Sequence, residues 1–353
     1  MNYFHSQKKG SVGITSFGAL IPKFRIKTSE ISSAWHKATD DGLALGIVEK
    51  TVPAFDQDTI TFATGAAEIA LSKLNDTKLK IGAIYTGSES HPYAVKSTSS
   101  IVGEALGVGN NYTAADLEFA CKAGTAALQI VCAEVISGLI EYGLAIGADT
   151  AQSRPGDPLE YSASSAGAAF IVGGEQDEIV ARLIATTSFT SDTPDFWRRE
   201  HMVYPSHGGR FTGEQAYFKH VLAATRGVLK LSQYKISDFN HVVFHMPNGR
   251  FPKTVAKTLG VSEQQMELGF VVPSLGNSYS ACSLVGFVNV LENSKKGDKI
   301  LLCSYGSGSG SDAFIFEVTE NISNLKSTGL LSKQMEKKKY VSYLEYRKLL
   351  NTL

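Results

Sequence analysis

The sequence has few cysteines, no excess charge of either sign and no long apolar run. Its 353 residues include four cysteines and no C-x-x-C pair, so neither a disulfide framework nor a zinc knuckle is expected. Lys plus Arg and Asp plus Glu number 34 each, which gives no overall field favouring nucleic acid or an anionic membrane. No signal-peptide core is present, and no window reaches about 18 uninterrupted apolar residues. We therefore expect a cytoplasmic protein with reduced thiols, bound to neither nucleic acid nor membrane.

Patterns for metal and nucleotide binding are also missing. The eight histidines form no H-E-x-x-H motif, and no Cys/His cluster gathers three ligands, so we expect no metal. The run "YGSGSGSD" (305–312) lacks the Lys-Ser/Thr ending of a phosphate-binding loop and leads into a strand-like segment. It predicts a hairpin whose backbone comes close to a bound chain.

Helical and strand-like segments alternate along the chain, which predicts a layered α/β architecture. Apolar spacing of three or four residues predicts a helix over 59–75. A helix (121–140), a strand (142–151), a polar loop and a second strand (167–175) come next. The same order returns about 150 residues later, at 277–294, 296–306 and 311–318, which indicates an internal duplication.

The duplication predicts two similar halves, 11–180 and 181–320, that pack as one body with their matching helices at the centre. Small residues in these helices would allow a close approach: Ala123, Gly124, Ala126 and Ala127 in the first, Ser280, Ala281 and Ser283 in the second. The basic, aromatic tail 321–353 is expected to wrap as helix or strand on the surface or on a neighbouring subunit.

Cys121 is the first candidate for chemistry. A buried free cysteine often only fills space, and Cys132 and Cys282, inside apolar helical patterns, are interpreted in that way. Cys121 instead precedes a helix start, where free N–H groups and the helix dipole favour a thiolate and can hold an oxyanion.

Three polar residues lie at the ends of predicted elements. His245 ends the strand-like run "HVVFH" before the turn "MPNGR", a position suited to acid–base work. Glu89 follows a strand in "YTGSESHPY", where an ordinary solvated glutamate is the alternative. Asn277 in "GNSYSAC" either caps the helix that it opens or holds a substrate carbonyl.

Taken together, these residues resemble the thiolase superfamily and, within it, the hydroxymethylglutaryl-CoA synthases of the archaeal type. The resemblance runs from about Ser11 to the C-terminus. Its segments include "GSESHPYAVKST", "EFACKAGTAALQ", "PGDPLEYSASSAGAAFIVG", "SFTSDTPDFWRRE", "HGGRFTGEQAYFKH", "FHMPNGRFP", "GNSYSACSLVGF" and "SYGSGSGSDAF". It implies the thiolase fold, with duplicated βαβαβαββ halves in a five-layer α/β/α/β/α sandwich.

The resemblance also implies a mechanism in the mevalonate pathway. Acetyl-CoA acetylates Cys121, and Glu89 removes a proton from the acetyl methyl group. The resulting enolate attacks the ketone carbon of acetoacetyl-CoA while His245 protonates the ketone oxygen, and hydrolysis frees the product. Such weakly acidic methyl protons require a positioned base together with oxyanion stabilisation.

Further contacts follow from the same resemblance. The acyl part is expected to meet Ser162, Thr212, Asn277 and Ser307, while Arg250 lies where a basic residue meets the CoA phosphates. The chain departs from the family at Met246, where Gln is usual, and at Thr254, where Arg is usual. Lys253, directly before Thr254, is the expected replacement for that phosphate contact.

The resemblance implies no cofactor beyond the CoA thioesters, but it does imply protein partners. A homodimer or dimer of dimers is expected, together with a complex containing acetoacetyl-CoA thiolase and a small zinc-ribbon/OB-fold protein. Three alternatives stay open. An initiating ketoacyl synthase would use Cys121, His245 and Asn277 without Glu89, and an acyltransferase subunit would pass acyl groups within an assembly. A degradative thiolase would use Cys303 as base, although its Cys-x-Gly spacing is absent.

Overall fold

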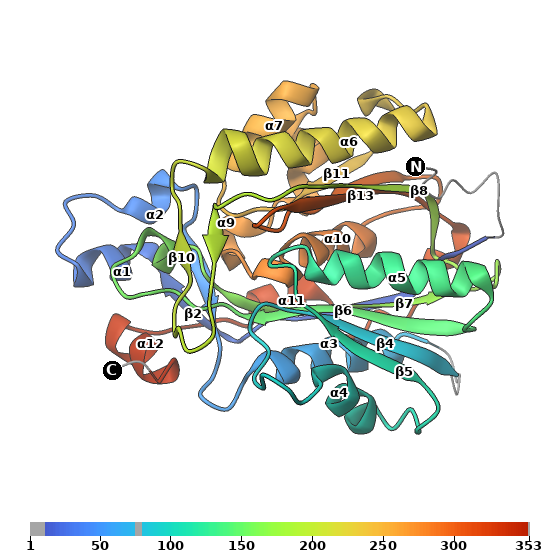
Figure 1. Cartoon of the computed structure of the whole chain (residues 1–353), viewed down its shortest axis with the longest axis horizontal. Helices are drawn as coiled ribbons and strands as arrows, with labels where there is room; N and C mark the ends of the chain where they lie inside the picture. The colour runs from blue at the N-terminus through green and yellow to red at the C-terminus, as the bar shows by residue number, and fades with distance from the viewer. Residues whose placement is uncertain (1–10, 75–79, 352–353) are drawn as a thin grey trace.

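Nine strands pair into one sheet among residues 11–74 and 80–351, the residues described by this computed structural model. Their order is β11-β12-β13-β8-β1-β7-β6-β4-β5. They are β1 (Gly13–Leu20), β4 (Ile81–Gly87), β5 (Thr113–Leu117), β6 (Tyr142–Thr150), β7 (Ser165–Gly173), β8 (Ala181–Thr190), β11 (His241–Phe244), β12 (Lys299–Cys303) and β13 (Gly310–Val318). β1 meets β8 at only two residue pairs, Gly13 with Arg182 and Ile14 with Ala181. The sheet therefore bends there into two layers (Figure 1).

Helices cover and separate the two sheet layers (Figure 1). On the outer face of one layer lie α6 (Lys219–Ser232) and α7 (Phe251–Leu259), and on the outer face of the other lie α3 (Thr59–Ser72) and α4 (Thr98–Leu106). Between the layers lie α5 (Ala123–Ser137) and α10 (Cys282–Glu292). The predicted layered α/β architecture is confirmed.

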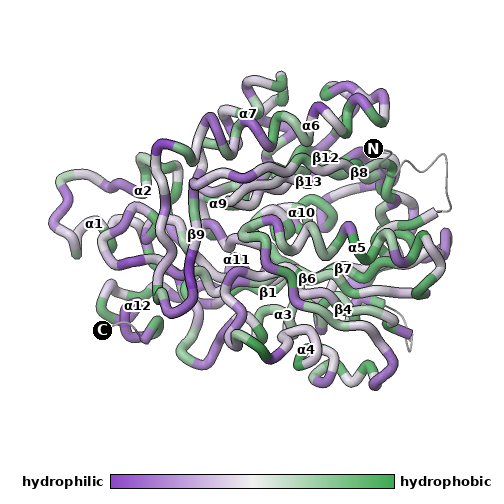
Figure 2. Tube along the Cα trace, in the orientation of Figure 1, coloured by the Kyte–Doolittle hydropathy of each residue, from purple (hydrophilic) through white to green (hydrophobic). Residues whose placement is uncertain are grey.

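The sequence pattern explains which helices are central. α10 is buried on most of its sides, as expected for a helix between two sheets. In Figure 2 hydrophobic residues concentrate on the central helices and strands, whereas α6 and α7 also carry hydrophilic ones. By length and composition Ala120–Ser137 is apolar enough to cross a membrane, but this segment is the central helix α5, packed on β6 and β4.

The two central helical segments meet as predicted. A Cβ at Gly124 would lie 2.8 Å from Leu284 Cδ1 and 2.9 Å from the Ser280 carbonyl oxygen. Ser280 belongs to the short 3-10 helix η6 (Tyr279–Ala281) that precedes α10. A side chain at Gly124 would therefore separate the helices. The helix predicted over 59–75 ends at Ser72, and Asn75 lies outside the described residues. The division into halves at residues 180 and 181 stays a prediction.

The tail folds back on its own chain. β14 (Lys339–Tyr340) pairs with β2 (Phe24–Lys27), which pairs with β3 (Glu49–Val52), and α12 (Tyr343–Leu349) follows. Buried Glu160 accepts hydrogen bonds from Trp35 Nε1 and the Tyr343 hydroxyl, and it forms an ion pair with Arg347. The remaining helices are α1 (Thr28–Ala34), α2 (Asp41–Ala44), α8 (Glu263–Met266), α9 (Val272–Leu275) and α11 (Leu331–Glu336). Residues 352–353 lie outside the described part of the tail.

Candidate active site

A cavity of about 260 Å³ lies where the central helical segments meet the strand ends, and it brings most of the predicted site residues together. Cys121 and His245 both line it. So do the four residues predicted to hold the acyl part: Ser162, Thr212, Asn277 and Ser307. Its other walls are largely apolar or aromatic and include Leu45, Pro158, Leu159, Phe196, Tyr217 and Phe251.

Cys121 stands in a sharp turn just before α5. The preceding Ala120 has a φ of 44°, in the left-handed region that residues with a Cβ rarely adopt. The glycine-rich turn between β12 and β13 packs against this segment, since a Cβ at Gly306 would lie 2.4 Å from the Phe119 carbonyl oxygen. The hairpin therefore comes close to the segment that carries Cys121, and its approach to a bound chain stays a prediction.

The surroundings of Cys121 disfavour the thiolate, contrary to the expectation drawn from the helix start. Burial raises the pKa of Cys121 well above its ordinary value, and the negative charges of Glu89 and Asp149 raise it further. The side chain is only 6% exposed. Desolvation and two carboxylates therefore outweigh the field of the helix terminus.

Glu89 reaches Cys121 from the loop after β4. Its Oε2 accepts a hydrogen bond from Cys121 Sγ at 3.8 Å. Burial and the charge of Asp149 raise the pKa of Glu89 well above its ordinary value, against the opposing effects of the Cys121 hydrogen bond and the positive charge of Arg198. A carboxylate with a raised pKa is a stronger base for a proton on carbon.

Asp149, at the end of β6, fixes the loop of Glu89, and the sequence reasoning did not single it out. Its Oδ1 accepts hydrogen bonds from the Glu89 backbone N–H (2.9 Å) and from the hydroxyls of Ser88 (2.7 Å) and Ser90 (2.6 Å). Its Oδ2 accepts from the Ser280 hydroxyl and N–H. Asp149 therefore joins β6, the Glu89 loop and η6. Its only signal in the sequence is its place at a strand end.

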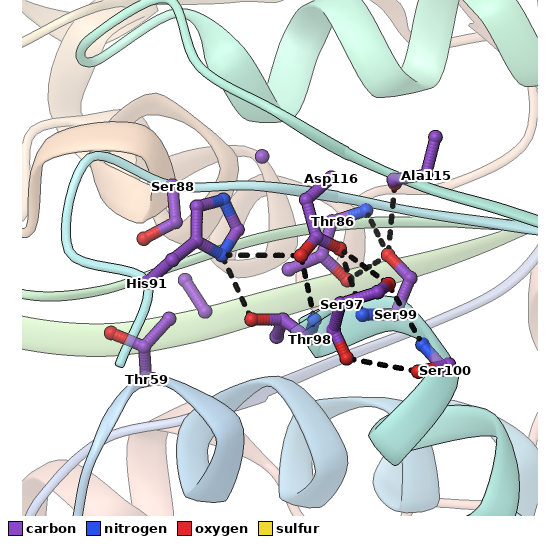
Figure 3. A network of polar contacts seen from close by, with 12 residues as sticks. Thr59, Thr86, Ser88, His91, Ser97, Thr98, Ser99, Ser100, Ala115 and Asp116 are labelled. Atoms are coloured by element: carbon purple, nitrogen blue, oxygen red, sulfur yellow. Dashed lines mark hydrogen bonds and ion pairs between the residues drawn. The ribbon is translucent and has the colours of Figure 1, made fainter. Parts of the chain in front are cut away.

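The chain after Glu89 is held by a second polar network (Figure 3). His91 Nδ1 lies 2.9 Å from Thr98 Oγ1, at the start of α4. Asp116 on β5 accepts hydrogen bonds from the backbone N–H groups of Thr98 and Ser99. The network ties the Glu89 loop, the α4 terminus and the edge of the sheet together.

His245 follows β11 and is neutral. Desolvation lowers its pKa to about 3, and the residue is 1% exposed. Its backbone N–H donates to the Cys303 carbonyl, and its own carbonyl accepts from the Tyr217 hydroxyl. Its Nδ1 is buried without a hydrogen-bond partner in the described residues. A neutral imidazole held in this way can donate one hydrogen bond to a substrate oxygen.

Asn277 and Ser162 are linked through their backbones. The Asn277 N–H donates to the Ser162 carbonyl at 2.7 Å, and the Ser164 N–H donates to the Asn277 carbonyl at 2.9 Å. The Asn277 side chain accepts from the Tyr279 N–H, at the start of η6. Asn277 thus helps to fold the turn before α10 and also lines the cavity.

The residues predicted to meet CoA phosphates lie outside the cavity. All three residues, Arg250, Lys253 and Thr254, are exposed. Arg250 directly precedes α7, and Lys253 and Thr254 lie in its first turn. Lys253 Nζ lies 5.1 Å from the ring centre of Phe270. The cavity reaches this helix through Phe251, so the three residues flank its α7 side.

Two further lining residues escaped the sequence reasoning. The Tyr305 hydroxyl donates to Asp195 Oδ2 at 2.5 Å, and both residues line the cavity. Asp195 also accepts from Thr193 Oγ1 and the Gly308 N–H, so it supports the turn that carries Ser307. Cys303, the base of the thiolase alternative, is 0% exposed and does not line the cavity.

Comparisons with known proteins cover nearly the whole chain. A family model, 3-oxoacyl-[acyl-carrier-protein] synthase III C terminal, matches residues 229–318. The hydroxymethylglutaryl-CoA synthase of Archaeoglobus fulgidus is 52% identical over 340 residues, covering 96% of this chain and 98% of that one. The synthase of the same name from Methanopyrus kandleri is 51% identical, over 96% and 97% of the two chains.

Solved structures agree in fold. An HMG-CoA synthase complexed with CoA superimposes with a TM-score of 0.85 at 22% identity, covering 96% of this chain and 90% of that one. A structure in complex with 3-hydroxy-3-methylglutaryl coenzyme A gives a TM-score of 0.87 at 19% identity, with 97% and 92% covered. At these identities the likeness concerns the fold alone.

Proposed function

Because the chain belongs to the hydroxymethylglutaryl-CoA synthase family, we propose roles for its own residues in the reaction of that family. The enzyme is an acyltransferase of the mevalonate pathway that condenses acetyl-CoA with acetoacetyl-CoA and water, giving 3-hydroxy-3-methylglutaryl-CoA and CoA. The thiolase fold predicted from the sequence is confirmed.

Cys121 is the nucleophile. Its sulfur attacks the thioester carbonyl of acetyl-CoA, and the proton that the thiol loses leaves with CoA. Free N–H groups for the oxyanion are expected at a helix start, but those of Lys122 and Ala123 already donate to the carbonyls of Phe119 and Ala120. The raised pKa of Cys121 disfavours the thiolate in the absence of substrate.

Glu89 and His245 catalyse the condensation. Glu89, in contact with Cys121, removes a proton from the methyl group of the acetylated cysteine. The enolate then attacks the ketone carbon of acetoacetyl-CoA in the cavity. The neutral imidazole of His245 donates a proton to the ketone oxygen, which would otherwise become an alkoxide in a poorly solvated site. The proton that Glu89 took from the methyl group then returns to His245, so that the imidazole is neutral and Glu89 is a carboxylate again before hydrolysis.

The other predicted residues bind substrate. Ser162, Thr212, Asn277 and Ser307 present short polar groups in a largely apolar cavity, which suits a neutral acyl chain. Arg250 and Lys253 supply positive charge on its α7 side, which suits the CoA phosphates. The Thr254 hydroxyl donates to the Arg250 carbonyl at 3.2 Å.

The single observation that carries this proposal is the contact between Cys121 and Glu89 beside a cavity that also holds His245. Incubation with labelled acetyl-CoA and peptide mapping test it. We expect one acetyl group on the peptide that contains Cys121 and none in Cys121→Ser. An acetyl group on another residue, or none in the wild-type protein, would sink the covalent mechanism.

We also propose a homodimer or dimer of dimers in the cytoplasm, in a complex with acetoacetyl-CoA thiolase and a zinc-ribbon/OB-fold protein. The resemblance supports these partners, and the free edge of β5 is suited to a second copy, because within the described residues β5 pairs on one side only. Copurification, followed by activity assays with and without the partners, tests the complex. Full activity of the isolated chain would show that they are not required.

A further inference from the structure

A second cavity, of about 300 Å³, lies beside the first. It is lined by Glu89, Ser90, Glu118, Gln152 and Arg198, among others. Glu89 does not line the first cavity, and neither Cys121 nor His245 lines the second. Phe196 and Ser307 line both and form the wall between them. The two spaces therefore lie on either side of the contact between Cys121 and Glu89.

The two cavities differ in chemistry. The first is largely apolar or aromatic, whereas the second carries carboxylate, amide and guanidinium groups. Glu118, Gln152 and Arg198 are exposed, so these polar groups lie at the solvent side of the second cavity. A space of this polarity and size holds water, because water there finds several hydrogen-bond partners.

The last step of the proposed reaction needs water at a moment when the first cavity is full. After condensation, the six-carbon acyl group is attached to Cys121 at one carboxyl and to CoA at the other. The pantetheine arm of CoA therefore still occupies the first cavity, and solvent cannot enter by that side. Water must reach the Cys121 thioester along another path.

We propose that the second cavity is the entry port for the water that hydrolyses the Cys121 thioester, an inference that rests on the proposed function. Water in the port meets Glu89, which takes one of its protons. The oxygen forms a bond to the thioester carbon, and the carbon–sulfur bond breaks. The proton passes from Glu89 to the cysteine sulfur, so that a free carboxyl group and the Cys121 thiol are the products.

Arg198 fixes the outer wall of the port. Its Nη2 donates to the Glu89 carbonyl at 3.3 Å and its Nη1 donates to the Met202 carbonyl at 3.4 Å. Arg198 follows β9 (Phe196–Trp197), which pairs with β10 (Ser206–His207). The hairpin that separates the two cavities is thereby tied to the loop of the proposed base.

The wild-type enzyme gives a direct test. Cys121 is first acetylated, and the first cavity is then filled with desulfo-CoA at a concentration that abolishes turnover of acetyl-CoA. Hydroxylamine, a small nucleophile that cleaves thioesters, is added, and the acetyl group on Cys121 is followed by mass spectrometry. We expect acetyl loss within a few-fold of the rate without desulfo-CoA. Complete protection of the acetyl group from hydroxylamine would overturn the proposal that the second cavity is an entry port.

A variant that blocks the port gives a second test. Gln152 is exposed on the rim, so Gln152→Trp is expected to place an indole ring over the opening. We expect unchanged acetylation of Cys121 and normal condensation, with the condensed acyl group accumulating on Cys121 because its release slows about tenfold or more. Leu139→Trp, at a 72% exposed site after α5, is the matched control and should behave as wild type.

The two proposals fail in different ways. If Gln152→Trp releases the condensed acyl group at the wild-type rate, the entry port is rejected and the proposed function stays intact. Absence of an acetyl group on wild-type Cys121 would reject the proposed function itself.

Discussion

The Sγ atom of Cys121 lies 3.8 Å from Oε2 of Glu89, although the two residues come from different elements. Cys121 precedes α5, and Glu89 follows β4. Both groups have raised pKa values because both are removed from water. The charge of Glu89 raises the pKa of Cys121 further, whereas the hydrogen bond from Cys121 opposes the rise at Glu89. The pair is thus arranged so that a thiol nucleophile and a carboxylate base act in turn on one acetyl group.

Glu89→Ala should separate acetylation from condensation. Loss of the carboxylate removes a negative charge beside the thiol, so the pKa of Cys121 should fall and its reaction with acetyl-CoA should persist. Condensation, which needs the base, should fall by about 10²- to 10⁴-fold. The rate of alkylation of Cys121 by iodoacetamide as a function of pH measures the first effect, and single-turnover assays measure the second. Retained condensation would favour a ketoacyl-synthase use of Cys121, His245 and Asn277.

His245→Gln should leave acetylation intact and slow condensation, since the amide can donate a hydrogen bond but cannot transfer a proton. The same variant tests the lowered pKa of His245. The unfolded state binds a proton near pH 6.5 and the folded state only near pH 3, so wild-type stability is lost as the pH falls through this window.

Between pH 7 and pH 5 the wild type should lose about 2 kcal/mol more of its free energy of unfolding than His245→Gln does. Urea unfolding at the two pH values measures the difference. An equal loss in both proteins would show that His245 is not desolvated as described.

Gly306→Ala should disturb the turn that carries Cys121. The new methyl group would overlap the Phe119 carbonyl oxygen, so the variant should lose about 1 to 3 kcal/mol of stability and acetylate slowly. Gly174→Ala is the control, because a Cβ there makes only ordinary contacts, at 3.6 Å. The thermal unfolding temperature and the acetylation rate of the two variants are compared to check this prediction. Equal behaviour would mean that the turn tolerates a side chain.

Lys50→Met should loosen the segment that carries Ser162. The buried Lys50 Nζ donates to the carbonyls of Glu160 and Ala163 and to the Tyr346 hydroxyl. Each carbonyl left without a donor costs about 1 to 3 kcal/mol. We expect lower stability and a higher KM for acetoacetyl-CoA, with Cys121 still acetylated. An unchanged KM would show that Lys50 supports the fold without affecting the cavity.

The sequence was sufficient to predict the helices and strands and to select the reactive residues that lie at their ends. Helix and strand periodicity located α5, α10 and the strands around them, and Cys121, Glu89 and His245 lie at the predicted termini. Asp149 and Asp195 were missed because their importance depends on contacts between segments far apart in the chain. The expectation of a thiolate at Cys121 was wrong for the same reason, since a helix-end argument includes neither burial nor the carboxylates of Glu89 and Asp149.

The fate of the acetyl group on Cys121 tests the central claim most directly. The acetylated wild-type enzyme, freed of excess acetyl-CoA, is mixed with acetoacetyl-CoA, and the released product is identified by mass spectrometry. The account predicts 3-hydroxy-3-methylglutaryl-CoA that carries the acetyl label, together with unmodified Cys121. Release of labelled acetate alone, with acetoacetyl-CoA recovered unchanged, would contradict it.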